Sequence, residues 1–237
     1  MTASLKMFGS MIRQISHEAM MAMLVIAPFA VGMIFRFGCP LLESKVLDRF
    51  GYGDVMVPYY DLFSWLLAML VGMMFAFVGG LVVLGEIDDG ITKYILVTPP
   101  GEAGYLFSRI IMPAIISGVV TALILPVFAL KHLNISEIAV MTVSTVLCGF
   151  VTALLVVTVS SNKVEGMAVG KLSGLFGVTF FAPLVLKGSI RYLFMVFPMY
   201  HIGVWSRGGS DFYLVIAALL FAVWITVLYR LFRRKFI

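Results

Sequence analysis

The stretch from Leu62 to Leu84 reads LFSWLLAMLVGMMFAFVGGLVVL and contains no charged residue. A helix needs about 20 consecutive, mostly apolar residues to cross the hydrocarbon core of a bilayer. The stretch meets this requirement and predicts a membrane-spanning helix. The composition agrees, because 62% of the 237 residues are hydrophobic and 12% are charged. A soluble domain is about half apolar and about a quarter charged, so the chain belongs to the membrane class.

Five other runs have a similar length and composition, and the chain shows no obvious repeat and no linker between soluble domains. We therefore predict an all-α fold: a single transmembrane domain over residues 1–237, with six membrane-spanning helices. The predicted spans are residues 19–37, 62–84, 110–130, 138–159, 167–186 and 212–228.

Two further segments are predicted not to span the membrane. Segment 4–17 is predicted to be an amphipathic helix in the interface, because four apolar residues share one face: Leu5, Phe8, Ile12 and Ile15. Segment 190–205 is aromatic, interrupted by Pro198 and too short to cross. We expect it to form a re-entrant or surface-lying piece on the outer side, before the last span.

The basic residues that flank the spans give the orientation, since Lys and Arg are enriched in short cytoplasmic loops. With both termini inside, ten Lys and Arg residues fall on the cytoplasmic side and seven on the outside. The C-terminal cluster 230–235 supplies four of the ten. We therefore predict cytoplasmic termini, and we attribute the net charge of +5 to topology rather than to nucleic-acid binding.

The sequence predicts no catalytic, metal or cofactor site. The run Gly166-Met-Ala-Val-Gly-Lys171 resembles a phosphate-binding loop but is one residue short, and Leu172 stands where Ser or Thr would bind magnesium. The three histidines lack metal-ligand spacing: His17, His132 and His201.

Span 167–186 begins beside a stripe of small residues, in which Gly166, Gly170 and Gly174 are spaced by four. Such stripes let two helix backbones approach closely. Two interpretations stay open, namely an interface that slides during a transport cycle and static packing within the bundle.

A polar connection, GEIDDGITKYILVTPPGEAGYLFSRI, runs from Gly85 to Ile110 between two apolar runs. Its apolar residues recur at helical spacing: Ile87, Ile91, Tyr94 and Ile95. The acidic pair Asp88-Asp89 near the start would favour the helix dipole, and Thr98-Pro99 would end the helix. The pattern predicts a short amphipathic helix within a loop at residues 86–104.

The chain resembles the permease subunits of second-type ABC exporters, especially small bacterial drug and peptide exporters. The resemblance rests on Glu86-x-x-Asp89-Gly90, an apolar helix, Thr98-Pro99, then Tyr105-Leu and Arg109. It covers the whole chain, from the interfacial helix to the last span. Many relatives have Thr after the Gly, whereas Ile91 follows Gly90 here.

The resemblance implies a permease that works as a dimer, with a second copy or a related permease, in the bacterial cell membrane. Separate cytosolic ABC ATPase subunits would hold ATP and Mg²⁺, and this chain would hold no cofactor. Segment 86–102 would be the coupling helix seated on the ATPase. The residues implied in coupling are Glu86, Asp89, Gly90, Ile91, Tyr94, Ile95, Thr98 and Pro99.

The resemblance further implies export of a hydrophobic or amphipathic compound, such as a drug, a peptide or a lipid-like molecule. Spans 62–84 and 167–186 would line its path, with candidate contacts at Met69, Met73, Phe77, Phe176 and Phe180. Flexible thioethers suit varied apolar ligands, but they suit packing and contact with membrane lipids equally well.

Two other classes remain as alternatives, a stand-alone secondary carrier or channel and a membrane-embedded enzyme. No Asp or Glu lies deep in a predicted span, which argues against a proton-coupled carrier. The lack of a nucleophile or a metal constellation argues against an enzyme.

Overall fold

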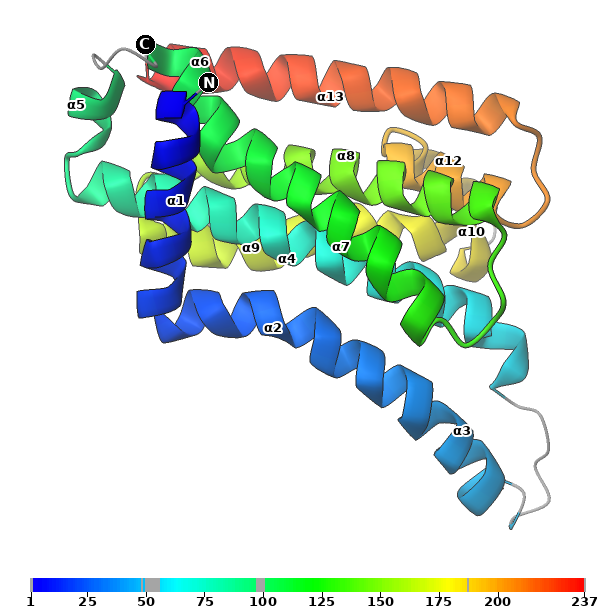
Figure 1. Cartoon of the computed structure of the whole chain (residues 1–237). Coiled ribbons are helices and arrows are strands. Elements are labelled where there is room, and N and C mark those ends of the chain that lie inside the picture. Colours follow the sequence, from blue (N-terminus) through cyan, green and yellow to red (C-terminus); the bar gives the residue numbers. More distant parts are fainter. Residues whose placement is uncertain (1, 48, 50–55, 97–100, 187, 237) are drawn as a thin grey trace.

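The computed structural model, shown in Figure 1, describes residues 2–47, 49, 56–96, 101–186 and 188–236. It contains six helical segments that are long and apolar enough to span a membrane, and the described residues contain no strand. The predicted all-α fold with six spans is therefore confirmed. The six segments are Ala19–Lys45, Val57–Asp88, Gly101–Phe128, Ile135–Val159, Lys163–Val185 and Phe212–Lys235.

The α-helices of the described residues are α1 (Thr2–His17), α2 (Ala19–Met33), α3 (Cys39–Leu42), α4 (Tyr60–Asp88), α5 (Thr92–Leu96), α6 (Gly101–Leu106), α7 (Met112–Phe128), α8 (Ile135–Val159), α9 (Lys163–Val178), α10 (Ala182–Val185), α11 (Arg191–Phe194), α12 (Pro198–Trp205) and α13 (Phe212–Phe236). Single π-helical turns continue the first and third spans at η1 (Ile34–Gly38), η2 (Glu43–Leu47) and η5 (Phe107–Ile111). Short 3-10 turns lie at η4 (Val57–Tyr59), η6 (Thr179–Phe181) and η7 (Gly188–Ile190).

Helices α4 and α8 form the centre of the bundle, and α4 packs against α2, α7, α8 and α9. In the most apolar part of each span, 67% of α4 residues and 61% of α8 residues are buried, against 17% in the first and last spans. The spans lie side by side, and α1, α5, α6 and the end of α13 gather at one end (Figure 1). We call this the α5 end, and we call the opposite end, near α12, the α12 end.

Helix α1 runs across the spans at the α5 end (Figure 1), as expected for an interfacial helix. Its Phe8, Met11 and Ile15 pack against Val78 and other apolar residues of α2 and α4. Ile12, which was predicted on this inward face, is 52% exposed, and the buried residue is instead Met11. The amphipathic helix is thus present, and Phe8 and Ile15 share its inward face as predicted, with Met11 rather than Ile12 buried between them.

Helix α12 is re-entrant rather than surface-lying. Its residues 198–203 are all buried, and the helix packs against α13 and η6. The indole Nε1–H of Trp224 in α13 donates a hydrogen bond to Val196 O at 3.1 Å. Eight residues of helix rise about 12 Å, far less than the roughly 30 Å of the hydrocarbon core, so α12 enters the bundle without crossing it.

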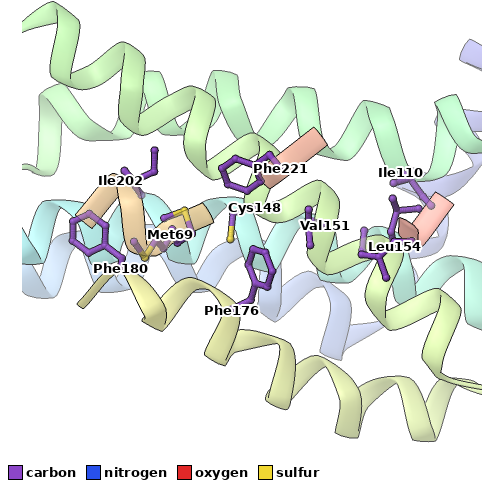
Figure 2. Close-up of a cluster of buried hydrophobic side chains, with 14 of the residues drawn as sticks. Met69, Ile110, Cys148, Val151, Leu154, Phe176, Phe180, Ile202 and Phe221 are labelled. Atoms are coloured by element: carbon purple, nitrogen blue, oxygen red, sulfur yellow. The ribbon is translucent and has the colours of Figure 1, made fainter. Parts of the chain in front are cut away.

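The main core is built around α8, as Figure 2 shows. Cys148, Val151 and Leu154 of α8 face side chains from other elements, including Met69, Ile110, Phe176, Phe180, Ile202 and Phe221. Lipid tails are as apolar as these side chains, so tight packing rather than exclusion of water favours helix association here.

The backbones of α4 and α8 touch directly where two glycines face each other. A Cβ added at Gly72 would lie 2.5 Å from Thr145 O, and one added at Gly149 would lie 2.5 Å from Gly72 O. Because backbone atoms cannot move aside as a side-chain end can, neither position has room for a larger residue.

We predict that Gly149→Ala destabilises the bundle by roughly 1–3 kcal/mol, the usual cost of overpacking. Gly174→Ala is the matched control, because nothing lies within 4 Å of a Cβ added there. The control should be neutral or stabilising by about 0.5–1 kcal/mol, since Ala favours a helix over Gly. Unfolding of both purified variants in mixed detergent measures the difference, and equal stabilities would refute the close crossing.

Candidate functional site

Helix α4 continues past its predicted end at residue 84 and closes at Asp88. The Ile91 N–H donates to Glu86 O at 2.9 Å, and the Gly90 N–H donates to Ile87 O at 3.0 Å. Gly90 has a positive φ of 69°, so these bonds form a Schellman motif. The acidic residues Asp88 and Asp89 therefore end α4 and do not begin the next helix, which corrects the sequence-based interpretation.

The separate helix of the connection, α5, is only five residues long. Ile91 and Tyr94 are exposed, by 44% and 76%. Ile95 is partly buried against the main core of the chain. Of the other residues predicted to take part in coupling, Asp89 is exposed, and Thr98 and Pro99 lie outside the described residues.

A buried ion pair joins the end of α4 to η5. Arg109 Nη2 lies 2.5 Å from Glu86 Oε1, and Arg109 Nε lies 3.2 Å from Oε2. The Tyr105 hydroxyl donates to the same Oε2 at 2.8 Å. The Arg109 and Glu86 side chains are only 4% and 7% exposed, so both charges are removed from solvent and satisfied by each other.

The same guanidinium holds the interfacial helix α1. Arg109 Nη1 donates to Met7 O at 2.5 Å, and Nη2 lies 3.4 Å from Ser10 Oγ. Close backbone contact positions η5 for this role, because a Cβ added at Gly79 of α4 would lie 2.5 Å from Arg109 O. One side chain thus connects α1, α4 and η5.

Further polar contacts join the remaining helices at the α5 end. The Lys163 N–H at the start of α9 donates to Asp88 Oδ2 at 2.9 Å, a favourable place for a carboxylate. Lys163 Nζ pairs with Glu18 between α1 and α2, at 2.5 and 2.7 Å. In α13, Lys235 Nζ donates to carbonyl oxygens at the end of α8, namely those of Val157, Thr158 and Ser160.

Two residues of the predicted small-residue stripe face α4. A Cβ added at Gly166 or Gly170 would collide with Leu84 or Phe77. Gly174 has nothing within 4 Å of such an atom. The first two glycines therefore take part in packing within the bundle, and the third does not.

The residues predicted to line a transport path lie in or against packed regions. Met69, Phe176 and Phe180 are buried. Phe180 stacks on Trp65 with ring centroids 4.5 Å apart, and Phe176 meets Trp224 edge to face at 5.3 Å. The other two are partly buried between α4 and α9: Met73, next to Gly177, and Phe77, next to Gly170.

Sequence reasoning did not include Tyr105, Arg109 or Lys163 among the site residues. Tyr105 and Arg109 belong to the motif that carries the resemblance, but nothing in their spacing shows that both reach Glu86. Lys163 is one of the ten basic residues that the sequence assigns to the cytoplasmic side. One signal in the sequence could have predicted the ion pair: the acidic Glu86 follows one apolar run and the basic Arg109 precedes the next.

Six apolar helices in one bundle, with a re-entrant helix and a polar cluster at one end, define a multi-pass membrane protein. The described residues contain no group of His, Cys, Asp and Glu that could hold a metal ion. The family model described as "Fluoroquinolones export permease protein Rv2686c-like" matches residues 11–231, and the chain belongs to this permease family. This agrees with the resemblance to exporter permeases. No curated protein and no solved structure matches the chain.

We predict that Glu86→Gln destabilises the protein by about 3–5 kcal/mol, because it leaves the Arg109 guanidinium buried without a counter-charge. Glu86→Leu combined with Arg109→Met should recover much of this loss, since neither charge then remains. Glu102→Gln is the control: Glu102 pairs with Arg233 at 3.5 Å in a more exposed setting, worth below about 1 kcal/mol. Thermal unfolding in detergent compares them, and equal losses in the two single variants would contradict the prediction.

Proposed function

We propose that the chain is the membrane permease subunit of an ATP-driven exporter. It moves hydrophobic or amphipathic drug-like compounds out of the cell, and the family description makes fluoroquinolones the first candidates. Separate cytosolic ATPase subunits bind ATP and Mg²⁺, and this chain supplies the membrane path. The observation that carries the proposal is the exposed apolar surface of α5 and the residue before it.

This α5 surface consists of Ile91 and Tyr94. Large apolar side chains in the lipid-facing spans need no special explanation, but α5 lies outside the spans. The same end of the bundle carries the charged side chains of Glu18, Asp88 and Lys163. Exposed apolar groups with a polar surround are typical of a protein-binding surface, and we assign the ATPase as the partner.

The α5 surface is attached firmly enough to transmit movement. On one side the Schellman motif joins it directly to α4. On the other side α6 and η5 return to α4 through Tyr105 and Arg109, which both bind Glu86. A displacement of α5 would therefore move α4, α1 and the third span together.

The proposed orientation in the membrane rests on the basic residues at the α5 end. The basic residues of the last turn of α13, Arg233, Arg234 and Lys235, lie at the α5 end. The positive-inside rule favours a cytoplasmic location for this end, so we propose that both termini lie in the cytoplasm and the α12 end lies outside. The cytosolic ATPase can then reach α5.

In the proposed cycle, ATP binding closes the partner ATPase dimer and displaces α5 in each of two permease chains. The second chain is another copy or a related permease. The compound is exported because the inward-open and outward-open states bind it with different affinities. A stand-alone carrier would not need the exposed α5 surface, and the experiment below separates the two.

We predict that Ile91→Asp with Tyr94→Asp abolishes coupling, because two carboxylates enter an apolar interface. Ile95→Asp is not suitable, since Ile95 packs against the chain's own core. In intact cells, efflux of the fluorescent fluoroquinolone norfloxacin should fall by about tenfold or more, as expected when hot-spot contacts are lost. The ATPase that co-purifies with the wild-type chain should be lost in parallel.

Tyr59→Asp is the matched control, since Tyr59 is 50% exposed and lies next to the start of α4, at the α12 end. It should leave efflux and co-purification unchanged, and both variants should reach the membrane in wild-type amounts. Wild-type efflux by the Ile91/Tyr94 variant would reject the coupling role. Gradient-driven norfloxacin flux through the chain alone in liposomes would support a secondary carrier instead.

A further inference from the structure

A pocket of about 450 Å³ with both polar and apolar lining residues opens at the α12 end, away from the α5 surface. It is formed by α10, α11, α12 and the segment that leads into α13. Its lining includes two arginines and two tyrosines, namely Arg191, Arg207, Tyr200 and Tyr213. Ligand pockets have volumes of about 300–1,000 Å³, so the size suits a small organic group.

The end of α12 places Arg207 in this pocket. The Gly208 N–H donates to Trp205 O at 3.0 Å, and the Gly209 N–H donates to Val204 O at 3.2 Å. Gly208 has a positive φ of 85°, so α12 ends in a Schellman motif. A Cβ added at Gly209 would lie 2.7 Å from Val204 O, which explains why the turn needs glycine there. The turn fixes Arg207 at its centre.

The two arginines carry charge that nothing in the pocket neutralises. Neither forms an ion pair within 4 Å in the part of the chain that the structure describes. The Arg191 guanidinium lies 5.4 Å from the ring centre of Tyr192, a contact that leaves its N–H groups free for an anion. Asp61 acts on Arg207 only at longer range, and its carboxylate lies 3.8 Å from Lys131 Nζ.

A buried histidine stands directly behind the two tyrosines. The His201 ring lies 5.4 Å from the Tyr200 ring and 6.0 Å from the Tyr213 ring. Its Nε2 lies 2.9 Å from Met195 O, which can only accept, so Nε2 carries a proton. His201 is 6% exposed, and its Nδ1 has no hydrogen-bond partner among the described residues. His201 does not line the pocket, and its ring contacts hold the two tyrosines that do.

We propose that this pocket is an anion-binding site on the outer side of the permease. The two guanidinium groups bind an oxyanion, a carboxylate or a phosphate, and the tyrosines contact the apolar or aromatic body that carries it. The outer location and the drug-like ligand rest on the proposed function. The oxyanion comes either from an exported amphiphile that is about to leave or from the headgroup of an outer-leaflet phospholipid.

The test uses Arg191→Gln with Arg207→Gln in the purified full chain, reconstituted in phosphatidylcholine nanodiscs without any ATPase. Norfloxacin carries a carboxylate, and its fluorescence anisotropy gives the dissociation constant directly. We expect the dissociation constant to rise about tenfold or more, because charge-assisted hydrogen bonds are lost. Norfloxacin ethyl ester lacks the carboxylate, so its weaker binding should be the same in variant and wild type.

Lys45→Gln is the matched control, because it removes an exposed cation at the same end that does not line the pocket. It should leave binding unchanged. If the glutamine variant fails to elute as a monodisperse species, Arg207→Gln alone and Arg191→Lys with Arg207→Lys replace it. The single variant should weaken binding, whereas the lysine variant should retain more affinity than the glutamine variant.

A second arm identifies the source of the oxyanion. Phosphatidylglycerol retained after detergent extraction is counted by native mass spectrometry in wild type and variant. Loss of norfloxacin affinity assigns the site to the carboxylate of the exported compound. Loss of bound phosphatidylglycerol alone assigns it to lipid phosphate. If neither changes, the anion site is refuted, while the coupling role of α5 is untouched because no ATPase took part.

Discussion

The buried pair of Glu86 and Arg109 is the constraint on which the rest of the structure depends. Burying two charges costs several kcal/mol for each ion, and attraction offsets this only when the remaining donors and acceptors are also satisfied. Here both carboxylate oxygens and the guanidinium nitrogens have partners, including Tyr105 and the backbone of Met7. Because those partners come from α1, α4, α6 and η5, the arrangement of four elements at the α5 end is fixed by one electrostatic requirement.

The two ends of the bundle differ in how their helices are connected. At the α5 end, the Asp88 carboxylate accepts from the Lys163 backbone N–H and joins α4 to α9, and the Lys235 ammonium joins α13 to α8. Neighbouring spans are thus connected by charged side chains as well as by packing. At the α12 end, the helices that pack around α12 surround a pocket lined by Arg191 and Arg207, which form no ion pair with the described residues. In the proposed orientation the connected α5 end faces the cytoplasm and the α12 end with its pocket faces outward, as the proposed transmission of movement and release of a ligand would require.

The number and type of helices could be predicted because the bilayer imposes length and apolarity on every span. The boundaries of the helices could not be predicted. Glu86 and Arg109 look like loop residues in a hydropathy pattern, but they lie inside helices and neutralise each other. The sequence also could not predict which face of each span is buried. Helices that are apolar all round give no amphipathic signal, so Phe176 and Phe180 could be placed on a transport path by resemblance, although both lie in the packed core.

Both candidate sites arise where a helix ends in the same way. The last carbonyls of a helix have no partner within the helix itself, and a Schellman motif satisfies two of them within the turn. The glycines Gly90 and Gly208 allow this through the bonds of a Schellman motif. The turn at Gly90 leads the chain out to Ile91 and Tyr94, and the turn at Gly208 holds Arg207 at its pocket. Backbone satisfaction at a helix end thus places the apolar surface at one end of the bundle and a cation at the other.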